Sequence, residues 1–87
     1  MYNEIDLHMM DSKTALEVFK KKYNEAVKKK DFREIIVIHG YGANKFSVDP
    51  SILKRLRSFL QINKDRLDYR IGINPGVTYV LPKKRVD

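Results

Sequence analysis

The sequence predicts an α/β domain with the element order βαβαββ, a two-layer sandwich of two helices on a four-stranded mixed sheet. Residues 35–38 are four branched aliphatics, which is typical of a central strand, and two closely spaced glycines follow them at positions 40 and 42. Stretches with apolar residues at helical spacing precede and follow this run. Two short strand-like segments separated by Asn-Pro-Gly close the chain and predict a hairpin.

Length and composition restrict the class of protein. Eighty-seven residues with 43% hydrophobic and 33% charged side chains fit one folded globular domain, which we place over residues 1–87. No apolar run is long enough to span a membrane, and no signal-peptide pattern is present. There is no cysteine for a disulfide or a thiolate metal site. We therefore expect a cytoplasmic protein with no membrane partner, and a longer protein could carry this domain.

The net charge of +7 favours a polyanionic partner, with nucleic acid first. A lysine-rich chain can also carry such a charge for solubility alone. A protein-interaction domain whose charge serves only solubility therefore stays open as an alternative to a nucleic-acid-binding domain.

The first strand is predicted over residues 4–8, where polar and apolar residues alternate, so Asp6 and His8 should share one face. Asp11 is a good N-cap for a helix over residues 12–30. The apolar stripe of this helix consists of Ala15, Leu16, Phe19, Tyr23, Ala26 and Val27. The outer face carries lysines, and the triplet at 28–30 suits the negative end of the helix dipole.

The strand at residues 35–38 is expected to be central and buried on both faces. A strand, a helix and a second strand in close succession predict a right-handed crossover between parallel strands. His8 follows the first strand and His39 the second. The two histidines should therefore lie at the same edge of the sheet.

The second half of the chain continues the pattern. Asp49 and Pro50 predict the start of a second helix, whose apolar face consists of Ile52, Leu53, Leu56, Phe59 and Leu60. Its basic residues, Lys54, Arg55 and Arg57, are expected mostly to face outward. Strands are predicted over residues 69–73 and 77–81, joined by a turn at residues 74–76 and followed by a basic tail at 83–85.

Three motifs in this order resemble those of the small MutS-related (Smr) domain family. They are Ile5-Asp6-Leu7-His8, His39-Gly40-Tyr41-Gly42 and Gly76-Val77-Thr78. The resemblance covers nearly the whole chain and implies a fold similar to the C-terminal domain of bacterial translation initiation factor three. Met9 departs from the usual glycine, and the loop after Gly42 is longer than in the family pattern.

The resemblance implies a nucleic-acid-binding domain, and several such domains are endonucleases on RNA or DNA. Asp6, His8 and His39 are the candidate catalytic residues. Two imidazoles can remove the proton of a 2′-hydroxyl and protonate the leaving oxygen, which favours RNA as substrate. DNA nicking would need an activated water, which is often metal-bound, so a divalent metal is possible for a DNA nickase. Otherwise we expect no cofactor. The alternative is a non-catalytic RNA- or DNA-binding module.

The candidate nucleic-acid-binding residues extend from the glycine loop to the second helix. Glycine N–H groups there could bind a phosphate, and an aromatic side chain could stack on an unpaired base. The candidates are Gly40, Tyr41, Gly42, Lys45, Phe46, Lys54, Arg55 and Arg57. No metal-ligand spacing occurs, and no Walker or dinucleotide fingerprint is present.

Overall fold

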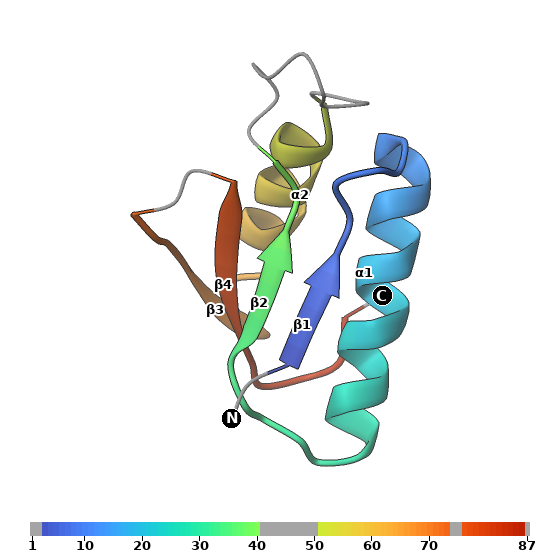
Figure 1. Cartoon of the computed structure of the whole chain (residues 1–87). Coiled ribbons are helices and arrows are strands. Elements are labelled where there is room, and N and C mark those ends of the chain that lie inside the picture. The colour runs from blue at the N-terminus through green and yellow to red at the C-terminus, as the bar shows by residue number, and fades with distance from the viewer. Residues whose placement is uncertain (1–2, 41–50, 74–75, 87) are drawn as a thin grey trace.

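The computed structural model describes residues 3–40, 51–73 and 76–86, and within these residues it confirms the predicted βαβαββ order (Figure 1). The elements are β1 (Asn3–Asp6), α1 (Ser12–Lys28), β2 (Ile35–Ile38), α2 (Ser51–Ile62), β3 (Leu67–Ile71) and β4 (Val77–Pro82). None of the helices in this described part is long and apolar enough to cross a membrane.

The strands form one mixed sheet in the order β1-β2-β4-β3. β1 and β2 are parallel neighbours, with Asp6 opposite Ile38, so the predicted parallel pairing across the intervening helix is confirmed. β4 is antiparallel to both β2 and β3. The third strand begins two residues earlier than predicted, because Leu67 is buried in the core, whereas Ile73 lies beyond the strand and is fully exposed.

Helix α1 begins where the sequence predicts it. The Asp11 carboxylate accepts hydrogen bonds from the Thr14 backbone N–H and hydroxyl, both at 2.9 Å, and so caps the helix. The helix ends at Lys28, two residues before the predicted end. Lys30 has a φ of 57°, a left-handed conformation that stops the helix.

The hydrophobic core lies between the sheet and the two helices, which cover the same side of the sheet (Figure 1). Phe19 of α1 and Phe59 of α2 meet edge to face at 6.0 Å between ring centroids. In β2, Ile35 and Val37 are fully buried, whereas Ile36 and Ile38 are only half-buried. The prediction that β2 is buried on both faces is therefore wrong, because no helix of the described chain covers the second face.

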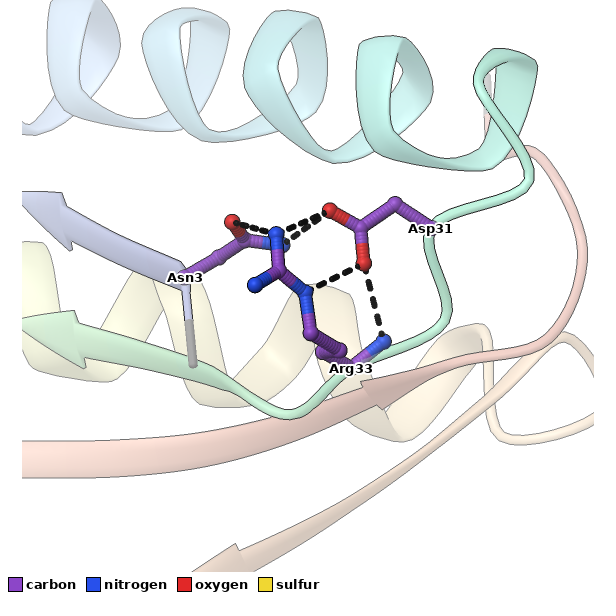
Figure 2. Close-up of polar contacts among 3 residues, drawn as sticks. All are labelled: Asn3, Asp31 and Arg33. Carbon is purple, nitrogen blue, oxygen red and sulfur yellow. Dashed lines mark hydrogen bonds and ion pairs between the residues drawn. The ribbon is translucent and has the colours of Figure 1, made fainter. Parts of the chain in front are cut away.

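Two polar clusters secure the segments between these elements. At the start of β1, the Asp31 carboxylate accepts hydrogen bonds from Asn3 Nδ2 at 3.1 Å and from Arg33 Nε at 2.8 Å (Figure 2). These bonds hold the pKa of Asp31 well below its usual range. At the chain's far end, Asn24 and Tyr23 of α1 bind the segment after β4, whose Val86 side chain is fully buried.

Candidate active site

The ends of β1 and β2 meet at one edge of the sheet, called here the carboxyl edge and defined by residues 6–8 and 38–40. The Leu7 N–H donates to the Ile38 carbonyl at 2.7 Å, which continues the parallel ladder one step beyond the strands. His8 follows Leu7, and His39 follows Ile38, so both histidines lie just beyond the ends of β1 and β2. The prediction that both histidines lie at the same edge is therefore confirmed.

Asp6 and His8 form an exposed pair at this edge. Nδ1 of His8 lies 2.5 Å from Oδ1 of Asp6, and the His8 backbone N–H also donates to that oxygen at 3.2 Å. Both side chains are about half exposed, at 52% for Asp6 and 49% for His8. Slight burial raises the pKa of Asp6, but the hydrogen bonds from His8 outweigh it, and the net direction of the pKa is downward.

A carboxylate can only accept hydrogen bonds, so Nδ1 of His8 is the donor in this pair. In the neutral imidazole the other nitrogen, Nε2, then carries the lone pair. The Asp6 carboxylate thus fixes the tautomer and the orientation of the His8 ring. A solvent-accessible base of this kind suits proton transfer to or from a bound substrate.

His39 has a different environment, because its side chain is only 1% exposed. Nδ1 donates to the Gly40 carbonyl, and in the neutral imidazole Nε2 accepts from the Thr78 hydroxyl, 2.8 Å away. Burial lowers the pKa of His39, the bond to Gly40 opposes this, and the positive charge of Arg57 lowers the pKa further. The net direction of the pKa favours the neutral ring, and both of its nitrogens have hydrogen-bond partners.

The two histidines share an edge but not a face of the sheet. Ile5 and Val37 point into the core beneath the helices, so their neighbours Asp6 and Ile38 point to the uncovered face. His39 follows Val37 by two residues and binds buried Thr78. The structure brings Asp6 and His8 together, and it does not bring the two imidazoles together as a proton-transfer pair.

Gly40 supports the turn after β2 rather than offering a free donor. Its φ of 73° is the left-handed conformation that favours glycine. The N–H groups of His39 and Gly40 both donate to the Gly76 carbonyl, at 3.0 and 3.1 Å. The expectation that the Gly40 N–H binds a phosphate is therefore wrong in this arrangement. Gly42 lies outside the described residues.

Arg57 is half-buried, so the expectation that it faces mostly outward holds only in part. Its Nε is buried and has no hydrogen-bond partner among the described residues, and its charge acts on His39. The spacing carried a signal that our sequence reasoning missed. Arg57 lies four residues after Leu53 and three before Leu60, which places it beside the apolar stripe.

The remaining binding candidates divide into two groups. Lys54 and Arg55 are exposed, as predicted, and with Leu16 and Phe59 they line a groove of about 500 Å³ between the helices. Tyr41, Gly42, Lys45 and Phe46 lie outside the described residues. Across residues 3–40, 51–73 and 76–86, no group of three His, Cys, Asp or Glu side chains could hold a metal ion.

Comparison with known proteins identifies the family. The profile described as "Smr domain" matches residues 5–83. The solution structure of the SMR domain of NEDD4-binding protein 2 superimposes with a TM-score of 0.71 at 23% sequence identity. That alignment covers 100% of this chain and 92% of the other, and it shows the same fold. No curated protein sequence matches the chain significantly. The resemblance predicted from the three motifs is confirmed.

Proposed function

This chain belongs to the Smr domain family, whose members bind nucleic acid, and from that premise we propose that it is an endonuclease that cleaves RNA at its carboxyl edge. The observation that carries the proposal is the exposed Asp6–His8 pair, with its 2.5 Å hydrogen bond, at the end of β1. In α/β sheets, ligands commonly bind at the carboxyl ends of strands.

In the proposed reaction His8 acts as the general base. Nε2 of His8 takes the proton of the ribose 2′-hydroxyl, and the 2′-oxygen forms a bond to the adjacent phosphorus. The bond from phosphorus to the 5′-oxygen breaks, and that oxygen takes a proton from water at the exposed edge. The products are a 2′,3′-cyclic phosphate and a 5′-hydroxyl. Asp6 orients the imidazole and stabilises its positive charge.

Arg57 is the proposed phosphate-binding residue of the same edge. Its buried Nε has no partner among the described residues, and a guanidinium forms strong, often bidentate bonds to phosphate oxygens. Exposed Lys54 and Arg55 would extend this cationic surface along α2. His39 receives a positioning role, because its two ring nitrogens hold Gly40 and Thr78 in place.

The test is cleavage of a labelled RNA and of the same RNA with one 2′-deoxy substitution at the cleaved position. Loss of cleavage at that position, persistence of cleavage of the unmodified RNA in chelator and a cyclic phosphate product are expected. His8→Ala should lower the rate at least about a hundredfold, the low end for losing a general base. Asp6→Asn keeps an oxygen acceptor but removes the charge, so a smaller loss is expected.

Three outcomes would contradict this reaction. Cleavage of the 2′-deoxy strand at an unchanged rate, or activity abolished by chelator, would indicate a metal-assisted nickase instead. Tight binding without cleavage of any RNA or DNA would indicate a non-catalytic module. The burial of His39 favours the non-catalytic module, because it leaves one accessible imidazole where the sequence suggested two.

A further inference from the structure

The charges of this domain are unevenly distributed between its two sides. On the uncovered face of the sheet, Arg70 binds Glu34 at 3.3 Å, and Lys83 binds Asp68 at 2.8 Å. Helix α1 and the turn after it instead carry Lys13, Lys20, Lys21, Lys22, Lys28, Lys29 and Lys30. Within the described part of the chain only Lys20 of these lysines has an ion-pair partner, Glu17 at 3.2 Å.

The helix dipole explains only part of this charge. Lys28 is the single basic residue in the last turn of α1, where the dipole favours a cation. Lys21 and Lys22 lie about two turns earlier, beyond the reach of that effect. Solubility does not require the cations to gather on one helix, and a polyanion that runs along α1 would be attracted to them.

The segment after β4 adds further cations beside the same helix and is held there by hydrogen bonds. Asn24 Nδ2 donates to the Val86 carbonyl at 2.7 Å, and the Val86 N–H donates to Asn24 Oδ1 at 2.9 Å. The Tyr23 hydroxyl donates to the Lys84 carbonyl at 2.8 Å. These bonds join positions that are about sixty residues apart in the sequence, and they fix the backbone of residues 84–86 beside α1 (Figure 1).

The result is a groove of about 560 Å³, called here the α1–tail groove, lined by Lys21, Asn24, Glu25, Val27, Lys28 and Arg85. The groove contains three cations, Lys21, Lys28 and Arg85, and one carboxylate, Glu25. None of these four side chains forms an ion pair with another described residue. Lys22, Lys29 and Lys84 are exposed nearby in the sequence. Rigid backbone under exposed cations lowers the entropic cost of binding an anion.

We propose that the α1–tail groove binds the phosphate backbone of an RNA that extends away from the carboxyl edge. The proposal rests on the proposed function for the identity of the nucleic acid. It adds that the substrate is long enough to contact two separate surfaces of the domain. The contact is with backbone phosphates, because lysines recognise charge rather than base sequence.

The length of α1 sets the size of that substrate. The helix starts just after the carboxyl edge, and at 1.5 Å per residue Lys21 and Lys28 lie about 14 and 24 Å along it. At roughly 3.4 Å per nucleotide of a strand, an RNA shorter than about four nucleotides would not reach Lys21 from the edge, and about seven nucleotides are needed to reach Lys28.

The experiment measures binding of labelled RNAs of about three and about 24 nucleotides as a function of salt, using fluorescence anisotropy. The groove variant combines Lys21→Gln, Lys28→Gln and Arg85→Gln. A matched variant, Lys64→Gln with Arg70→Gln and Lys83→Gln, removes the same charge elsewhere. All six side chains are exposed, so both variants should fold, and circular dichroism checks this.

The groove variant should bind the long RNA at least about tenfold more weakly than the matched variant, and its salt slope should fall by about two. Binding of the short RNA should be equal for both variants. Glu25→Gln, which removes the carboxylate of the groove, should tighten binding of the long RNA. Equal affinities and slopes for the two triple variants would overturn the proposal, whereas the cleavage reaction is judged separately from the Asp6 and His8 variants.

Discussion

The imidazole Nε2 of His39 lies 2.8 Å from the hydroxyl oxygen of Thr78, and both residues are buried. This contact joins the end of β2 to β4, and two backbone bonds to the Gly76 carbonyl reinforce it. The last two sequence motifs therefore meet in space as one structural unit. We infer that this unit holds the carboxyl edge in place, while Asp6 and His8 carry the proposed chemistry.

Thr78→Val should destabilise the domain by about 1–3 kcal/mol, because it leaves Nε2 of His39 buried without a donor. Thr78→Ser keeps the hydroxyl and should cost less. Urea unfolding followed by circular dichroism measures both. A larger cost for Thr78→Ser than for Thr78→Val would mean that the methyl group of Thr78, rather than its hydrogen bond, matters.

Stability should fall as the solution is acidified below about pH 6.5, the value at which an unfolded histidine titrates. The pKa of His39 is lowered in the folded protein, so the unfolded chain takes up the proton first and unfolding becomes more favourable. The destabilisation that arises from His39 is absent above that pH, and it becomes constant below the pKa of His39 in the folded protein. His39→Gln should flatten this part of the stability profile relative to His8→Gln, which keeps the buried ring.

Arg57→Gln should raise the pKa of His39, because it removes a positive charge that disfavours the protonated ring. An NMR titration of the imidazole protons measures the shift directly. Arg55→Gln removes an equal charge from an exposed neighbour and is the control. An unchanged His39 pKa in Arg57→Gln would remove the reason for placing Arg57 at the carboxyl edge.

Ile35→Ala and Ile36→Ala compare the two faces of β2 with the same substitution. Ile35 is fully buried, and its replacement should cost about 2–5 kcal/mol. Ile36 is half-buried on the uncovered face, and its replacement should cost less than about 2 kcal/mol. Chemical denaturation checks both values, and equal costs would indicate that a partner or a second copy covers that face in solution.

Asn24→Ala should weaken binding of the long RNA without changing the net charge, because it releases the backbone of Val86 and loosens Arg85. It should also lower stability by about 1–3 kcal/mol, since the groups bound by Asn24 lose their partners. Gln61→Ala, on the other helix, loses one exposed hydrogen bond and should leave RNA binding unchanged.

Local patterns in the sequence were enough to predict the elements and their order. Alternation, helical spacing and the Asp11 cap act over a few residues, so they can be recognised without knowing the fold. The crossover rule then placed His8 and His39 at one edge, because parallel strands end on the same side. The three motifs likewise identified the family correctly.

The sequence alone determined the strands, the helices and the shared edge, whereas tertiary packing decided what each site residue can do. Both helices lie on one side of the sheet, so the uncovered face holds Asp6 in solvent while His39 is enclosed against Thr78. The same packing buries Nε of Arg57. Burial and hydrogen-bond partners arise between segments distant in the chain, and no local pattern encodes them.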